Sequence, residues 1–192
     1  MWWARLLNLI AAIHGVGTPA STNSYESIAT TTVGAGGSAT VTFSSIPSTY
    51  KHLQVRGIVR NTAAGTSING IFAQFNSDTA SNYSRHNLIG DGASATATAS
   101  TSTTNVLAGQ YPQGGTTASI FSGFVFDILD YGDINKYKTT RASGGVDLNG
   151  SGQIRLISGN WRSTSAITSI TLTPEDANFA QYSQFALYGI KG

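Results

Sequence analysis

One loop in the last third of the chain carries residues of the kind that bind a metal ion. Asp147, Asn149 and Ser151 alternate ahead of Gly152, which copies the first half of an EF-hand calcium loop. The bidentate acid of such a loop is missing, because Ser158 stands at its position. A glycine-rich hairpin turn accounts for the same residues, and we favour the turn over a calcium site. We therefore expect neither a metal nor another cofactor.

Three acids at a spacing of three form the second cluster that could do chemistry: Asp127, Asp130 and Asp133. On a strand, Asp127 and Asp130 point to opposite sides, so they do not converge as a pair of catalytic carboxylates. Asp130 and Asp133 flank Gly132, and we expect both to cap the amides of a turn there.

The histidines and serines show no catalytic spacing. His14, His52 and His86 have no histidine or acid two to four residues away, so the spacing of a zinc site is absent. No G-x-S-x-G motif is present, and three isolated histidines support no catalytic triad. We predict that the chain is not an enzyme.

Composition narrows the class of protein further. The 192 residues suffice for one main domain, and none is cysteine, which excludes disulfides and thiolate metal sites. Only 10% are charged, and the 11 Lys and Arg residues are scattered without a basic patch. We therefore expect no nucleic-acid partner. No apolar run approaches the 20 residues of a membrane-spanning helix, so we expect no membrane insertion.

The elements that position these residues are short strands with period-two alternation, separated by glycine-rich turns. They predict an all-β domain over residues 25–192, an antiparallel β-sandwich of jelly-roll type. The low-complexity stretch 93–104 has no bulky apolar residue, and we expect an exposed loop, with contact to a partner as its functional alternative. The expected strands are 25–32, 39–43, 53–59, 68–75, 83–89, 105–111, 118–129, 137–142, 153–161, 167–173 and 184–190.

The N-terminus differs from everything after it. Residues 1–14 are apolar almost all round, and we expect a short anchoring helix that needs a partner. Residues 15–24 contain small and polar residues, which predicts a flexible linker. Because Arg5 is the only positive side chain ahead of the apolar run, a retained protein anchor is favoured over a signal peptide. The side chains expected to dock are Trp2, Trp3, Leu6, Leu7, Leu9, Ile10 and Ile13.

Aromatic side chains are the candidates for binding a glycan, because the apolar face of a sugar stacks on aromatic rings. Most of them lie within or beside expected strands, so packing in the core or at its rim is the alternative interpretation. Tyr83, Tyr111 and Tyr131 are the candidate receptor-facing residues. The full set is Tyr50, Tyr83, Tyr111, Tyr131, Tyr137 and Trp161.

Residues 24–192 resemble a domain family that recurs in virion proteins of tailed bacteriophages. The resemblance rests on YESIA (25–29), VTFSSIPSTYKHL (41–53), FNSDT (75–79) with SNY (81–83), DILDY (127–131), NKYKT (135–139), WRSTSAITSI (161–170) and FALYGIK (185–191). It implies a jelly-roll module on the exterior of the virion, commonly a trimer, and it supplies no catalytic residues. The N-terminal anchor lies outside the resemblance.

Together these features predict a short homotrimeric tail fibre, docked on another virion protein of the tail or baseplate through residues 1–14. Its loops would face the host surface, with a host glycan as a candidate ligand. A capsid decoration protein or head fibre is the alternative: the same domain and apolar N-terminus would attach to a capsid protein in place of a tail protein. A carbohydrate-binding module is a further alternative from another class of function.

Overall fold

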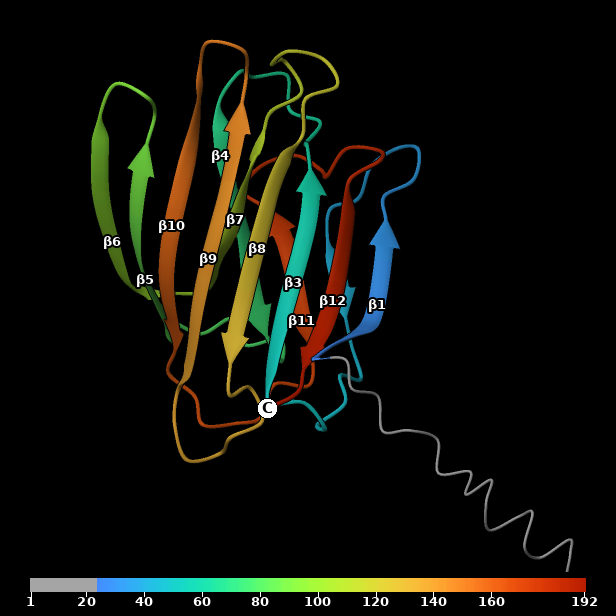
Figure 1. Ribbon diagram of the computed structural model, residues 1–192, viewed down its shortest axis with the longest axis vertical. Coiled ribbons are helices and arrows are strands. Elements are labelled where there is room, and N and C mark those ends of the chain that lie inside the picture. Colours follow the sequence, from blue (N-terminus) through green and yellow to red (C-terminus); the bar gives the residue numbers. More distant parts are fainter. Residues whose placement is uncertain (1–23) are drawn as a thin grey trace, which may run out of the picture.

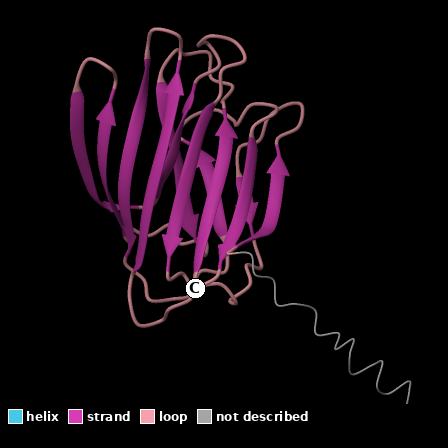
Figure 2. Cartoon of the chain, in the orientation of Figure 1, coloured by secondary structure: helices cyan, strands magenta, loops and turns pink. Residues whose placement is uncertain are grey.

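The computed structural model describes residues 24–192, and the predicted anchoring helix and nearly all of the predicted linker lie outside the described residues. Every element in the described part of the chain is a β-strand (Figures 1 and 2). The strands are β1 (Tyr25–Thr32), β2 (Val41–Phe43), β3 (His52–Val59), β4 (Ile68–Phe75), β5 (Tyr83–Gly90), β6 (Ala95–Thr103), β7 (Val106–Pro112), β8 (Ser122–Leu129), β9 (Lys138–Asp147), β10 (Gly152–Trp161), β11 (Ile170–Pro174) and β12 (Gln184–Ile190).

The strands form two antiparallel sheets. The larger has eight strands in the order β1-β12-β3-β8-β9-β10-β5-β6, and the smaller has four in the order β2-β11-β4-β7. Figure 1 shows the small sheet behind the middle of the large one. The predicted all-β antiparallel sandwich is thus confirmed. In the part of the chain that the structure describes, no helix is long and apolar enough to cross a membrane.

The core lies between the two sheets and is built from alternate residues of each strand. Leu53, Val55 and Val59 of β3 are fully buried, as the period of two predicts. Phe75 of β4 and Phe126 of β8 face each other from opposite sheets, with parallel rings whose centroids are 6.4 Å apart. The sheets are therefore joined by apolar packing, the term that dominates folding stability.

The low-complexity stretch is a strand and not the loop that its composition predicts. Ala95–Thr103 forms β6, which pairs with β5 at one edge of the large sheet and is exposed along nearly its whole length. The prediction was wrong because an edge strand forms by backbone pairing with its neighbour and needs few buried side chains. The Thr residues that recur along β6 also favour an extended chain. Strand β9 of the same sheet also extends past its predicted end to Asp147, because Gly144 and Gly145 pair with β8.

Antiparallel order places alternate turns at opposite ends of the sandwich. The chain enters β1 beside the C-terminus, where Lys191 N donates to Ser24 O at 3.0 Å. We call this the linker end, and Figure 1 shows the turns after the even-numbered strands there. The turns after the odd-numbered strands, including 91–94 and 148–151, form the opposite end, which we call the tip end.

Candidate binding face

The three tyrosines expected to face a receptor are buried. Tyr83 and Tyr111 have no exposed surface and Tyr131 is 1% exposed, so the receptor-facing prediction was wrong and the core-packing alternative holds. The physical reason is that both ends of each side chain are used inside the sandwich: the ring packs in the core, and the hydroxyl meets a polar partner there.

At the tip end, Tyr111 belongs to a cluster built around the carboxylate of Asp176. Tyr111 Oη and Asn61 Nδ2 donate to Asp176 Oδ1 at 2.8 and 2.7 Å, and Gln113 Nε2 donates to Oδ2. Burial raises the pKa of Asp176, but these hydrogen bonds outweigh burial and hold the pKa below its usual value. The cluster ties strand β7 to the loops after β3 and β11.

Arg60 fixes a second part of the tip end. Its guanidinium donates to four backbone carbonyls of the loop between β7 and β8, at 2.7 to 2.9 Å. The side chain is only 8% exposed, and burial lowers its pKa from the usual value. Because one planar cation satisfies four carbonyls, this long loop has a fixed conformation. The carbonyls belong to Gly114, Thr116, Thr117 and Ile120.

The other two tyrosines brace turns at the linker end. Tyr83 Oη accepts from Phe75 N at 3.0 Å and donates to Asp78 O at 3.1 Å. Tyr131 Oη donates to Pro47 O. Both tyrosines therefore position backbone turns. A surface that contacts a partner must be formed by other residues.

The acids near the linker end have structural partners. Asp133 caps a turn as predicted, since Asn135 N donates to its Oδ1 at 2.8 Å. Asp130 does not, because its carboxylate forms ion pairs with Lys136 and Lys51 that lower its pKa to about 2. Asp127 lies on a different surface, so the three acids share no site.

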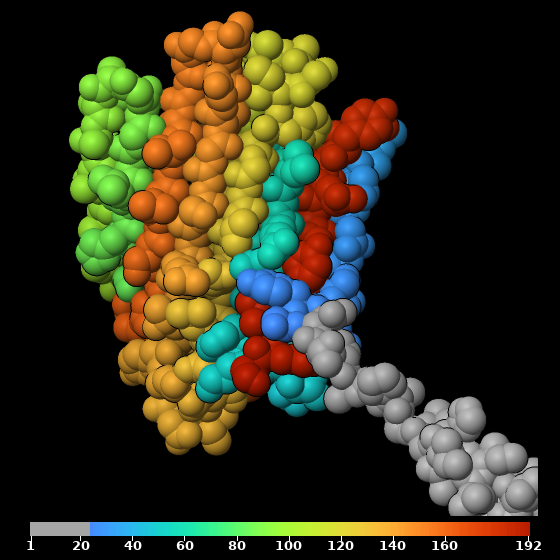
Figure 3. Space-filling model, viewed as in Figure 1, coloured from blue at the N-terminus to red at the C-terminus, as the bar shows by residue number. Residues whose placement is uncertain are grey.

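That surface is the outer face of the large sheet, on which Figure 3 looks directly. Register partners define rows that cross all eight strands. One is almost entirely polar, and we call it the polar row: Ser27, Tyr188, Gln54, Asp127, Arg141, Ser158, His86 and Ala99. The sequence does not reveal this row, because it depends on which strands are neighbours.

Three neighbouring members of the polar row are joined by side-chain hydrogen bonds. Arg141 Nε donates to Asp127 Oδ2 at 2.8 Å, and Gln54 Nε2 donates to Oδ1 at 2.6 Å. Arg56, one rung higher, donates to Gln54 Oε1 at 2.6 Å. These contacts hold the exposed guanidinium groups of Arg56 and Arg141 in place, where they can donate hydrogen bonds to a polar ligand.

Two tyrosine rings flank the guanidinium of Arg56. Its central carbon lies 5.2 Å from the centroid of Tyr25 and 5.1 Å from that of Tyr188, both within cation–π range. Tyr25 is 45% exposed. Tyr188 is half-buried, and neither tyrosine is among the aromatic candidates that the sequence pattern predicts.

Toward the tip end, the outer face becomes apolar. Ile58, Leu88, Ile154 and Leu156 are each at least 49% exposed, and Val125 lies among them. Leu156 and Leu88 are direct register partners, and Ile58 and Ile154 lie one rung higher, with Gly123 and Gly145 between them. Several exposed aliphatic side chains on one face are typical of a surface that meets a partner.

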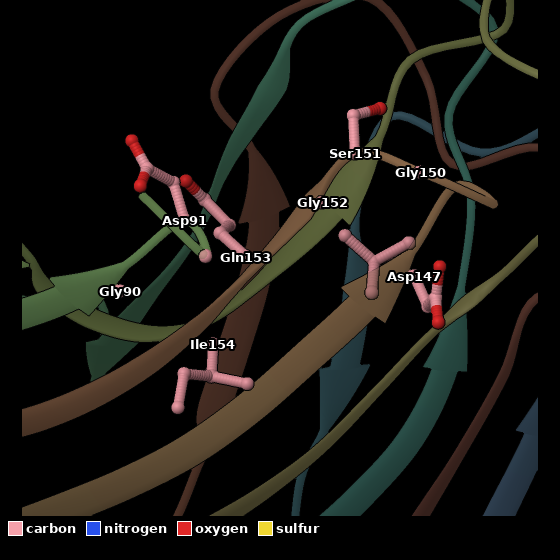
Figure 4. A pocket seen from close by; sticks show the side chains of 10 residues that line it. Gly90, Asp91, Asp147, Gly150, Ser151, Gly152, Gln153 and Ile154 are labelled. Atoms are coloured by element: carbon pink, nitrogen blue, oxygen red, sulfur yellow. The ribbon is translucent and has the colours of Figure 1, made fainter. Parts of the chain in front are cut away.

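A shallow cleft of about 500 Å³ lies at the rim between this face and the tip end. Figure 4 shows Asp91 and Asp147 at opposite sides of it, on different hairpins. Both carboxylates bind their own turns: Asp91 accepts from Ser94 N at 2.7 Å, and Asp147 from Asn149 N at 2.8 Å. The predicted hairpin turn after Asp147 is confirmed. Among residues 24–192, no three His, Asp or Glu side chains lie close enough to hold a metal.

Comparison with protein-family models, with curated protein sequences and with solved structures found no match to this chain.

Proposed function

We propose that this chain is a structural attachment protein on the exterior of a tailed-bacteriophage virion, a short homotrimeric tail fibre. The observation that carries the proposal is the position of the linker end. The N-terminal linker joins the sandwich beside the C-terminus, where Lys191 N donates to Ser24 O. An attachment through residues 1–14 therefore leaves the tip end and the outer face free to meet a host surface.

The strand order supports the finer fold assignment, a jelly roll. Four strands at one side of the large sheet form two hairpins that are additional to this pattern, β5–β6 and β9–β10. The remaining eight strands then pair first with last, second with seventh, third with sixth and fourth with fifth. A long antiparallel hairpin rolled into two sheets has this pairing, the pattern of a jelly roll. The pairs are β1·β12, β2·β11, β3·β8 and β4·β7.

The polar contacts support a structural role over catalysis. Asp176, Asp130 and Asp91 each bind neighbouring side chains or turn amides, and Arg60 binds four carbonyls. Their hydrogen-bonding capacity is used to hold loops, which a passive attachment module requires.

Deletion of residues 1–14 is the direct test. We expect the 15–192 variant to keep the thermal midpoint of the full chain, because the described core comes entirely from the sandwich. It should no longer join virions when it is supplied to a phage that lacks its own copy. Each large apolar side chain removed contributes about 2 kcal/mol to such a docking contact.

A full-length Trp3→Ser, Leu7→Ser, Ile10→Ser variant serves as the matched control, because it keeps the length and removes apolar area. It should fail to join virions as the deletion does. Normal incorporation of either variant would refute the docking role. Native mass of the purified full chain tests the trimer, with three times 20.0 kDa expected.

A head fibre or capsid decoration protein is the alternative location for the same module. Copy number separates the two, because a tail carries a few copies and a capsid carries tens or hundreds.

A second candidate function, carbohydrate binding, is favoured by the exposed aromatic and polar groups around Arg56. Tyr25 offers a ring edge and face for the apolar side of a sugar, and the exposed guanidinium groups of Arg56 and Arg141 offer hydrogen-bond donors. The buried Gln54 and Asp127 hold these two groups in place. The fixed geometry of these planar groups suits pairs of sugar hydroxyls better than a mobile surface would.

We expect Tyr25→Ala to lower affinity at least tenfold for any glycan that the purified protein binds on an array. Removal of the ring eliminates both the stacking surface and one side of the Arg56 sandwich. Tyr137→Ala is the matched control, since Tyr137 is 54% exposed and lies in the turn after β8 at the linker end. Equal losses in the two variants, or binding that Tyr25→Ala leaves intact, would contradict a site at Tyr25.

A further inference from the structure

The two sheets have four edges; two of them limit pairing with another chain along their whole length, and a third, β1, carries such features only in its first half. Strand β2 has only three residues, and all seven residues of β7 are buried. Strand β1 carries a bulge between Ser27 and Ala29 and the charged side chain of Glu26. Short length, coverage, bulges and charges are the usual protections of an edge strand.

The fourth edge, β6, has little of this protection. It is nine residues long, contains neither a charged residue nor proline, and pairs with β5 alone among the described strands. Its only irregularity is a register shift near its linker-end terminus, between Tyr83 and Arg85 of the partner strand. A long uncharged edge with free backbone groups is a template for another strand.

The direction of the strands indicates which strand could complete that edge. The large sheet is antiparallel with eight strands, so its two edges, β1 and β6, run in opposite directions. They also have similar lengths, eight and nine residues. If copies are related by rotation about an axis along the strands, β6 of one copy meets β1 of the next in antiparallel orientation, the slightly more stable pairing.

Such a rotation also keeps every linker end on the same side of the assembly. Pairing of β6 with β6 of another copy has the opposite consequence. An antiparallel β6–β6 contact needs a twofold axis across the strands, which sends the two linker ends in opposite directions. A common attachment site for several N-termini is then excluded.

We propose that copies of this chain associate head to tail through the edges of the large sheet, β6 of one pairing antiparallel with β1 of the next. The contact is heterologous, and three copies close it into a ring. The assignment rests on the trimer of the proposed function and names the surface that forms it.

Introduced cysteines test the contact cleanly, because the chain has none of its own. Ala97 of β6 and Thr30 of β1 lie in the same row, at opposite edges of the outer face. Seven strand spacings of about 4.8 Å separate them within a copy, so a disulfide between them forms only between copies. Double variants pair Ala97→Cys with Thr30→Cys or Thr32→Cys, which covers two rungs.

After mild oxidation, we expect a covalent trimer on a non-reducing gel for at least one double variant and monomers for each single variant. A covalent dimer from Ala97→Cys alone would overturn the proposal in favour of β6–β6 pairing. An open ladder of larger species would overturn the closed ring. A native trimer without cross-links in either double variant would refute this contact and leave the proposed trimer standing. A native monomer would refute both.

Charge at the edge gives a second measurement that does not depend on oxidation. Ala97→Lys should dissociate the native trimer into monomers at the concentration where the unmodified chain stays assembled. Ser143→Lys is the matched control, because Ser143 is exposed in the same row but lies on a central strand. If both lysine variants remain trimers, or both dissociate, the contact is not formed by the edge strand β6.

Discussion

Replacing Asp176 with alanine is expected to lower the free energy of unfolding by about 3 kcal/mol or more. The substitution leaves Tyr111 Oη and Gln113 Nε2 without their acceptor, while Asn61 Nδ2 keeps only the backbone carbonyl of residue 176. Each buried donor left unpaired costs about 1–3 kcal/mol. Chemical denaturation at pH 7 measures the loss. Faster hydrogen exchange in the loops of the tip end should accompany it, because these donors tie β7 to two loops.

Asp147→Ala is the matched control for that prediction. Asp147 is exposed and accepts from the amide of its own hairpin turn, so its removal should change stability little. If both variants lose the same stability, the buried cluster is not the cause.

The effect of Asp176→Ala should also depend on pH. The folded-state pKa of Asp176 lies below its usual value of 3.8. The stabilisation by its carboxylate is therefore complete above the unfolded-state pKa and is lost as the pH falls through the folded-state pKa. The difference in free energy of unfolding between the unmodified chain and the variant should decrease as the pH falls from 5 toward 2. A difference that does not change with pH would show that the Asp176 carboxylate is not the source of the stabilisation.

Replacing Lys138 with methionine is the second change with a large expected effect, again about 3 kcal/mol. Lys138 is fully buried, and its Nζ donates to the carbonyls of Asp133, Lys136 and Thr164. Methionine keeps most of the packing volume but leaves three carbonyls without a donor. Chemical denaturation should show the loss, and hydrogen exchange should rise in the turns at the linker end.

Lys136→Met is the matched control, because Lys136 is two residues away and its side chain is 53% exposed. It loses ion pairs with Asp130 and Asp133, and exposed pairs of this kind contribute little. The midpoint of unfolding should stay close to that of the unmodified chain. A larger loss for Lys136→Met than for Lys138→Met would show that charge, and not satisfaction of buried carbonyls, is what Lys138 supplies.

The sequence predicted the fold class and most strands correctly because the relevant signal is local. In β3, Leu53, Val55 and Val59 share one face and Gln54 and Arg56 the other, and the period of two identifies both a strand and its buried face. The hairpin turn after Asp147 was equally readable, because its glycines and asparagine take positive φ angles that favour those residues.

The candidate binding residues were not predictable in the same way. In β5, Tyr83 shares a face with Arg85 and Asn87, so neither face of the strand has an apolar pattern. The sequence therefore does not predict whether Tyr83 is buried. Tyr111 lies on β7, a strand buried on both faces where the large sheet extends over its side of the small one. Burial of these rings depends on what covers a strand, which is a non-local property.

The sequence by itself determined an antiparallel all-β domain, its turns, and a separate apolar segment whose docking role stays a prediction. Only the tertiary structure decided that Asp127, Gln54 and Arg141 meet on one face, and that β6 is an exposed edge. The physical reason is that side-chain alternation states which residues share a face of one strand. Which strands become neighbours depends on hydrogen bonds and packing between segments far apart in the chain. Local sequence patterns therefore do not predict which strands pair.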